Sequence, residues 1–382
     1  MKKWFLTITL LSLAGNIVLL SILLSARHAD LDLSKITEKT HARSAATKGK
    51  GHDARPSRNP AATESKRQLG SNEVDRDETP SSPDDRQLLA DIYKGDQEVQ
   101  KPSASEIKSI LENNLDDPSM LVAAFMMTKD RAHLKEALKL FPNDPNVLLI
   151  AATNADSTEK RLDLLQRLKA ADPDNALPLY LTAHALFELN DITGAIKEID
   201  KASLTAKCDD YWLQSSYGME EIYRDAGHSA AIAKAMAFKS TVLPHLSKVR
   251  ELSRFLGEAY ESALQSGDTS LAHHLVENDR ELGSRLVENS PIIIQLVGLK
   301  IENTALKRIQ ELATDEETKE FSKQFLRINK QHTADIRYLV SLFEDTLEGA
   351  SDSNISSYFD RARTLGEFEA LRWFIGKQQS KK

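Results

Sequence analysis

Apolar runs separated by short polar breaks follow one another along the chain after residue 86. The dipeptides Asp117-Pro118, Asp144-Pro145 and Asp172-Pro173 recur at nearly equal intervals, each followed by an apolar run, a polar break and a second amphipathic run. Aspartate accepts hydrogen bonds from the free amides at a helix start, and proline is tolerated in the first turn. Strand-like alternation is nearly absent. The pattern therefore predicts that residues 87–382 form an all-α domain of helical hairpins.

Polar residues that favour helix ends mark a second, longer period in the same region. Asn and Gly accept the left-handed backbone conformation that ends a helix in a tight turn. Such residues return at similar intervals, at Asn154, Asn190, Gly227, Gly267 and Asn303. A hairpin of this size cannot bury its own apolar face, whereas a row of stacked hairpins can. We therefore predict an α-solenoid of antiparallel helical hairpins.

Residues 175–202 resemble one unit of the tetratricopeptide-repeat (TPR) family. The polar pair Asn190-Asp191 stands at the turn, and small side chains stand where the two helices of such a unit cross, at Ala183, Ala195 and Ala202. Three positions depart from the family pattern: where Trp, Leu and Tyr are usual, this chain has Leu179, Thr182 and Leu186. The neighbouring hairpins keep the helical pattern but not these residues. The resemblance implies a TPR-like domain that binds other proteins.

In the TPR family, the first helix of each hairpin lines a concave groove that holds peptides. The resemblance places five residues of this chain there as a partner-binding groove: Leu177, Tyr180, His184, Phe187 and Glu188. They would offer an apolar surface with two polar groups, which suits an extended segment or a helix. The alternative is that they pack on the next hairpin, and that His184 is an ordinary histidine without a ligand.

The first 26 residues have the composition of a membrane segment. Met1-Lys2-Lys3 precedes an uncharged, largely apolar run at 4–26, which is long enough to cross a bilayer as a helix. We predict an uncleaved transmembrane signal-anchor; the alternative is a cleaved secretory signal, but large residues near the end of the run spoil the small-residue cleavage pattern. A very short basic start resembles bacterial signal-anchors. We therefore expect a single-pass protein of the bacterial inner membrane with its helical domain outside the cytoplasm.

Residues 27–86 are predicted to form a disordered linker. They contain no Phe, Trp or Tyr and are dominated by Ser, Thr, Pro, Gly and charged residues. Such a segment cannot bury enough apolar surface to offset the entropy of ordering. Its first part is basic and its end is acidic. The basic part could contact anionic lipid head groups, and the simpler alternative is solvation of an ordinary linker.

Charge and motif content exclude several classes of function. The net charge is −7 and the region after the linker has no basic stripe, so nucleic acid is not an expected partner. Cys208 is the single cysteine, which rules out an intrachain disulfide and a cysteine metal cluster. The adjacent residues His273-His274 diverge on a helix and cannot share one metal ion. Phosphate-binding, serine-hydrolase and zinc-protease motifs are absent from the sequence, so we expect no catalytic residue, no cofactor and no metal.

Together these features predict a membrane-tethered, TPR-like scaffold or adaptor that binds a protein or peptide partner and has no catalysis of its own. Two alternatives stay open from the sequence. One is a self-associating structural spacer. The other is a helical-solenoid enzyme, whose site would be assembled across distant hairpins and would leave no local motif. The sequence predicts neither the identity of the partner nor the oligomeric state.

Overall fold

The computed structural model describes residues 87–89, 91, 93, 100–288, 291–347 and 349–379, all of which lie in the unit Pro80–Lys382. The predicted membrane segment at 1–26 and the predicted linker at 27–86 lie outside the described residues. In the part that is described, no helix has both the length and the apolar character needed to cross a membrane.

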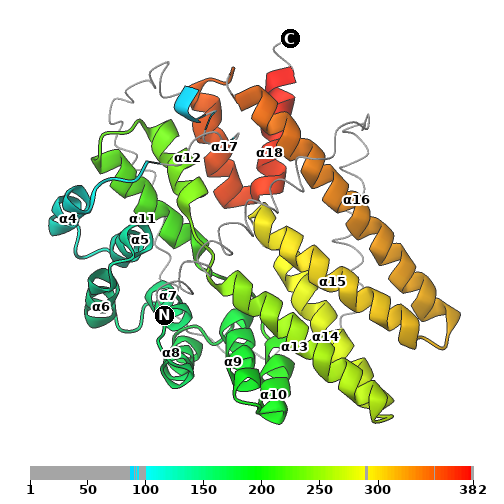
Figure 1. The fold of residues 1–382 in the computed structure, drawn as a ribbon. Coiled ribbons are helices and arrows are strands. Elements are labelled where there is room, and N and C mark those ends of the chain that lie inside the picture. Colours follow the sequence, from blue (N-terminus) through cyan, green and yellow to red (C-terminus); the bar gives the residue numbers. More distant parts are fainter. Residues whose placement is uncertain are drawn as a thin grey trace, which may run out of the picture. The chain divides into compact units, whose positions relative to one another are not determined.

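All regular structure in these residues is helical, which confirms the prediction of an all-α domain (Figure 1). Apart from one isolated bridge between Asn175 and Lys207, the described ranges contain no β-structure. Helix α4 spans Ala104–Glu112 and begins with a capping box, in which Ser103 and Glu106 bond each other's backbone amides.

Three antiparallel hairpins follow one another between residues 118 and 203, and we call this part the hairpin region. Their helices are α5 (Pro118–Thr128) with α6 (Arg131–Leu140), α7 (Pro145–Thr153) with α8 (Thr158–Ala171), and α9 (Ala176–Glu188) with α10 (Ile192–Ser203). Asp117 and Asp144 cap α5 and α7, each with proline as the next residue. Contacts of α5 with α7 and of α8 with α9 join each hairpin to the next.

The predicted turn residues mostly end helices. Asn154 is the C-terminal cap of α7, and Asn190, Gly227 and Gly267 all adopt the positive φ angles expected of a left-handed turn. The prediction at Asn303 is wrong, because this residue lies inside helix α15 (Ile292–Leu312). The apolar stripe of α15 continues on both sides of it, and its side-chain oxygen accepts a hydrogen bond from a residue of α16. Packing here overrides the preference of asparagine for turns.

After α10 the chain leaves the row of hairpins, and residues 212–379 form what we call the return region. Helix α11 (Trp212–Asp225) packs on α5, at the start of the hairpin region, instead of beside α10 (Figure 1). Gly218 permits the close approach, since a Cβ atom there would lie 2.2 Å from the carbonyl oxygen of Ser119. A position that needs glycine thus fixes a contact that local sequence order does not suggest.

The remaining helices connect the two ends of the described chain. They are α12 (Ala230–Ser240), α13 (His245–Gln265), α14 (Thr269–Val287), α15, α16 (Glu316–Leu347), α17 (Asp352–Leu365) and α18 (Glu367–Gln379). Helix α13 packs on α9, α14 on α15, α15 on α16, α16 on α18, and α17 on α12, which pairs with α11. Helix-to-helix contacts therefore lead from the hairpin region through the return region and back to α5.

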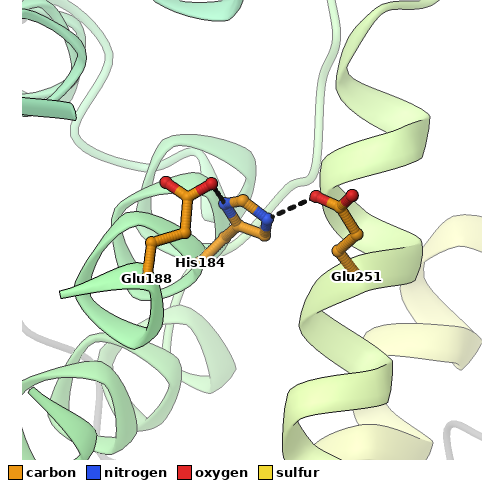
Figure 2. Close-up of side chains that lie close together, drawn as sticks. All are labelled: His184, Glu188 and Glu251. Carbon is orange, nitrogen blue, oxygen red and sulfur yellow. Dashed lines mark hydrogen bonds and ion pairs between the residues drawn. The ribbon is translucent and has the colours of Figure 1, made fainter. Parts of the chain in front are cut away.

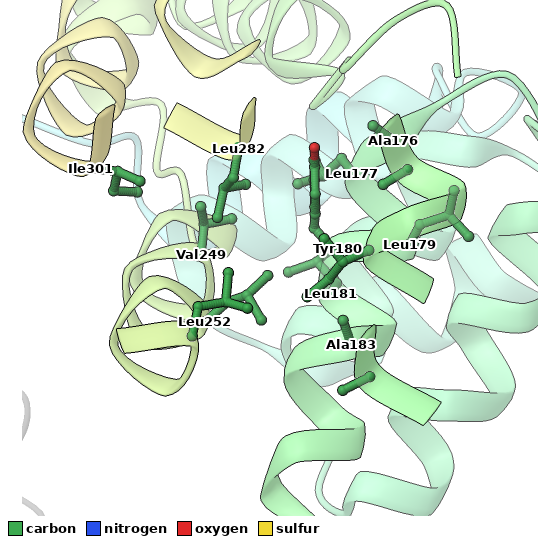
Figure 3. Packing of buried hydrophobic residues seen from close by; sticks show 14 of the residues in the cluster. Ala176, Leu177, Leu179, Tyr180, Leu181, Ala183, Val249, Leu252, Leu282 and Ile301 are labelled. Atoms are coloured by element: carbon green, nitrogen blue, oxygen red, sulfur yellow. The ribbon is translucent and has the colours of Figure 1, made fainter. Parts of the chain in front are cut away.

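One large apolar cluster joins α9 to α13 and α14. Tyr180 and Leu181 of α9 lie opposite Val249 and Leu252 of α13, with Leu282 of α14 beside them (Figure 3). Three small residues of the third hairpin are fully buried, namely Ala183, Ala195 and Ala202. The first helix of this unit is therefore covered by α13, which places a polar cluster at the junction of the two helices.

Candidate functional site

The five residues predicted to line a partner-binding groove lie together on α9. Leu177, Tyr180, His184 and Phe187 are buried, and only Glu188 keeps a substantially accessible side chain, at 29%. The sequence left open whether these residues line a groove or pack on another hairpin. In the structure, the apolar members among them belong to the cluster shared with α13. Their role in binding a partner stays a prediction.

His184 and Glu188 form a polar pair on the edge of α9 that faces α13. They are four residues apart, which places both side chains on the same face of the helix. Nε2 of His184 lies 2.8 Å from Oε2 of Glu251 on α13, and Nδ1 lies 3.9 Å from Oε1 of Glu188 (Figure 2). Each of the three residues offers one atom that could bind a metal ion, and these three atoms lie within 4.8 Å of one another. The histidine ring is therefore held between two carboxylates from different helices.

Two cations accompany these carboxylates. Nζ of Lys248 lies 3.8 Å from Glu188 and 3.7 Å from Glu251, and Nη1 of Arg161, on α8, lies 2.5 Å from Glu188. Positive and negative charges are therefore equal in number, and contacts between them connect α8, α9 and α13. The pairs are partly exposed, so each ion pair is expected to contribute at most about 1 kcal/mol.

Burial and hydrogen bonding together set the protonation state of the histidine. Burial lowers the pKa of His184, and this effect outweighs the opposing hydrogen bond to Glu251 and the charge of Glu188. For Glu251, burial raises the pKa, but the bond to His184 and the charge of Lys248 prevail and leave it below the usual value. The ring is thus neutral beside an ionised carboxylate near pH 7.

Aromatic packing fixes the orientation of the ring. The Phe255 ring of α13 lies 5.7 Å from the His184 ring and stacks on Phe187 at 5.5 Å, between ring centroids. The guanidinium of Arg254 covers Phe255 at 4.5 Å. A very small open pocket lies beside the histidine, between α7, α8, α9 and α13, with about 10 Å³ of space for the centre of a water molecule; it is lined by Ala152, Thr153, Arg161, Leu165, Leu181, His184 and Lys248. Pockets for small organic ligands are far larger, roughly 300–1,000 Å³, so this one has room for about one water molecule at most.

A second polar cluster lies where the chain passes from the hairpin region to the return region. Nε2 of His245, at the start of α13, lies 3.3 Å from Oδ2 of Asp210, and both side chains are buried. Burial raises the pKa of Asp210 to about 7 and lowers that of His245 to about 3. Burial also raises the pKa of Cys208 to about 12, so this thiol is protonated and a poor nucleophile near pH 7.

Sequence reasoning identified His184 and Glu188 but missed Glu251 and Lys248. The spacing of the first two on α9 is visible in the sequence, whereas nothing in the sequence distinguishes Glu251 from the other acidic residues of a later helix. Only the packing of α13 on α9 brings it to the histidine. No protein-family model, curated protein or solved structure matches this chain.

Proposed function

We propose that this protein is a membrane-tethered helical scaffold that binds a protein partner or a client polypeptide and has no catalytic activity of its own. The observation that carries the proposal is the row of three antiparallel hairpins with fully buried alanines at the crossings of the third. Repeated hairpins of this kind present extended surfaces, which protein-binding repeat domains use. The third hairpin is the TPR-like unit, and its neighbours are diverged units of the same kind.

The accessible edge of α9 is the best candidate for the contact surface. Helix α13 covers most of the predicted groove, but Glu188 and Glu251 remain partly accessible beside it. Leu189, in the turn after α9, and Ile192, the first residue of α10, are 48% and 50% exposed. We call these four residues the α9 edge. Exposed apolar side chains flanked by carboxylates suit an apolar segment of a partner.

The burial of the candidate acid–base groups favours a scaffold over an enzyme. Asp210 and His245 are enclosed by packing, the thiol of Cys208 is protonated, and His184 is bonded to Glu251. A substrate could not reach the first two without local opening of the fold. The alternative of a self-associating spacer predicts that the mass of the protein in solution rises with its concentration, whereas a monomeric adaptor keeps a constant mass.

The proposed location rests on the sequence of residues 1–26. A signal-anchor there would hold the chain in a bacterial inner membrane with the helical domain outside the cytoplasm. Reporter fusions joined after residue 86 measure this directly. Activity of a reporter that works only outside the cytoplasm is expected, and activity of a cytoplasm-only reporter would contradict the orientation.

Partner binding is tested by co-purification of the full chain in mild detergent. The edge variant Leu189→Asp with Ile192→Asp adds charge at exposed positions and should cost little stability. A specific partner is expected with the wild type and absent, or reduced several-fold, with the edge variant. The matched control is Leu140→Asp, an exposed leucine at the end of α6.

The outcome that contradicts the α9 edge is the same partner recovered equally with the wild type and the edge variant. The predicted groove residues are poor targets for this test. Tyr180 and Phe187 are core residues, and replacing either with alanine is expected to cost about 3–5 kcal/mol through the cavity that it leaves. Loss of binding in such variants would then report unfolding.

A further inference from the structure

The two ring nitrogens of His184 face carboxylates of different residues, Glu251 and Glu188 (Figure 2). Nε2 lies 2.8 Å from a carboxylate oxygen of Glu251, and because a carboxylate only accepts hydrogen bonds, Nε2 carries the proton of the neutral ring. Nδ1 therefore holds a lone pair. It is buried, has no hydrogen-bond partner among the described residues, and faces Oε1 of Glu188 at 3.9 Å. Two acceptor atoms thus face each other with no proton between them.

A cation between these atoms would satisfy both. Zinc binds imidazole nitrogen and carboxylate oxygen at about 2.0–2.2 Å, so two ligands of one tetrahedral ion lie roughly 3.4 Å apart. The observed separation of 3.9 Å needs only a small inward rotation of Glu188. We propose that Nδ1 of His184 and Oε1 of Glu188 bind a divalent transition-metal ion such as zinc, with water completing its coordination.

The surroundings match those of a metal-binding histidine. A carboxylate bonded to the other ring nitrogen commonly fixes the tautomer and orientation of such a histidine, and Glu251 occupies that position. Arg161 holds Oε2 of Glu188 and leaves Oε1 for the ion. The stacking of Phe255 on Phe187 and its contact with His184 restrict the ring further. Glu251 therefore acts as a positioning residue, and His184 and Glu188 as the ligands.

Lys248 competes for the same position. Its ammonium lies 3.8 Å from Oε1 of Glu188 and 3.7 Å from Glu251, so it supplies positive charge where the ion would bind. The side chain is partly exposed, so the ammonium can turn into solvent when an ion enters. Removing this charge should strengthen ion binding, which distinguishes a metal site from a purely structural ion-pair network.

The test is zinc binding to the full-length chain in detergent, measured by competition with a chromophoric zinc chelator. The wild type is expected to bind one zinc ion with an affinity in the micromolar range. Glu188→Gln keeps the size and the hydrogen-bonding capacity of the side chain and should weaken binding at least about tenfold. Lys248→Gln should strengthen it several-fold, and Glu251→Gln should weaken it. Circular dichroism and thermal unfolding show that each variant is folded.

The matched control is His274→Gln. His274 also pairs with a carboxylate, with Nε2 at 2.8 Å from Asp200, but in a more exposed setting. Its replacement should leave zinc binding unchanged. The proposal is overturned by equal zinc affinity in the wild type and Glu188→Gln, by equal loss in His274→Gln, or by unchanged or weaker binding in Lys248→Gln. Co-purification of a partner does not enter this test, so its outcome is independent of the scaffold proposal.

Discussion

The hairpin region and the return region are both helical, but different interactions hold them together. In the hairpin region the helices are short, they begin at side-chain caps, and consecutive hairpins contact each other, while α5 and α9 also pack on α11 and α13. The return region has longer helices, several buried charged groups, and ion pairs between residues far apart in sequence. Arg363 of α17, for example, is paired with Glu220 of α11, and Lys234 of α12 with Asp360 of α17.

The difference shows where local sequence signals are sufficient and where they are not. A hairpin that packs on its neighbour needs only a start signal, a turn and an apolar face, and all three can be found within one segment. A helix that packs on a distant segment depends on partner residues that sequence order does not indicate. For such a helix, the loss of a charged partner is expected to reduce stability the most, because a buried charge without its partner is strongly unfavourable.

The largest effect is expected at the buried pair of the return region. The two terminal nitrogens of the Arg363 guanidinium are bonded, Nη1 to Glu220 and Nη2 to Ser216 at 3.0 Å. Arg363→Met leaves the buried carboxylate of Glu220 without this partner and should lower the free energy of unfolding by about 3–5 kcal/mol. Urea unfolding followed by circular dichroism measures the change.

Two further variants distinguish the contribution of the buried ion pair to stability from that of side-chain packing. Adding Glu220→Met to Arg363→Met removes both charges and should recover much of the lost stability, since apolar side chains of similar size often replace a buried pair well. Arg254→Met removes one partner of the exposed pair with Glu258 and should change stability by less than about 1 kcal/mol. Equal losses at the buried and exposed pairs would contradict the proposed distinction.

The sequence predicted the hairpin region well. The Asp-Pro starts at 117 and 144 and the turn at Asn190 follow from local chemistry, a cap and a left-handed turn. The third Asp-Pro does not start a helix, because Asp172 ends α8 and Asn175 caps α9. The buried alanines of the third hairpin were placed by the resemblance to a known repeat. The turn predicted at Asn303 is wrong because packing between distant segments, and not local preference, decides the structure there. Its helix is set by packing against α14 and α16, and turn preference is too weak to interrupt it.

The candidate site could be predicted only in part for the same reason. His184 and Glu188 share one face of one helix, so their pairing is visible in the spacing. Glu251 and Lys248 reach them because α13 packs on α9 after the chain has passed through α11 and α12. The packing of α11 on α5 depends on Gly218, whose significance appears only when Ser119 is seen beside it. Long-range packing therefore decides the site.

A smaller effect is expected from a buried carboxyl of the return region. Burial raises the pKa of Asp279, on α14, to about 7. In the unfolded chain its pKa is near 3.8, so between these values the folded protein binds the additional proton. The protonated Asp279 carboxyl contributes its full stabilisation to the folded protein below the unfolded-chain pKa. This contribution is lost as pH rises through the folded-state pKa, and the free energy of unfolding falls by up to about 1.4 kcal/mol per pH unit.

Asp279→Asn removes this contribution to the pH dependence of the unfolding free energy. Between pH 5.5 and 7 the difference in unfolding free energy should shift in favour of the variant as pH rises, because only the wild type must take up a proton at this position when it folds, and that becomes less favourable as protons become scarcer. Urea unfolding of both proteins across this range measures the shift and cancels contributions from other groups. The control in the hairpin region is Asp156→Asn: Arg131 lowers the pKa of Asp156, so this exposed carboxylate stays ionised throughout and the variant should show no such shift. The prediction would be contradicted if the unfolding free energies of Asp279→Asn and the wild type changed in parallel between pH 5.5 and 7.

The smallest effect is expected at a helix cap of the hairpin region. The carboxylate of Asp144 accepts a hydrogen bond of 2.9 Å from the amide of Val147 at the start of α7. Asp144→Ala should cost about 1 kcal/mol, whereas Asp144→Asn keeps an acceptor and should cost little. Asp163→Ala, at an exposed position inside α8, should be neutral or slightly stabilising. Hydrogen exchange should place the loss at α7 and its neighbours, because α7 and α8 contact mainly α5, α6 and α9. A loss spread evenly into the return region would instead show that the two regions unfold as one cooperative unit.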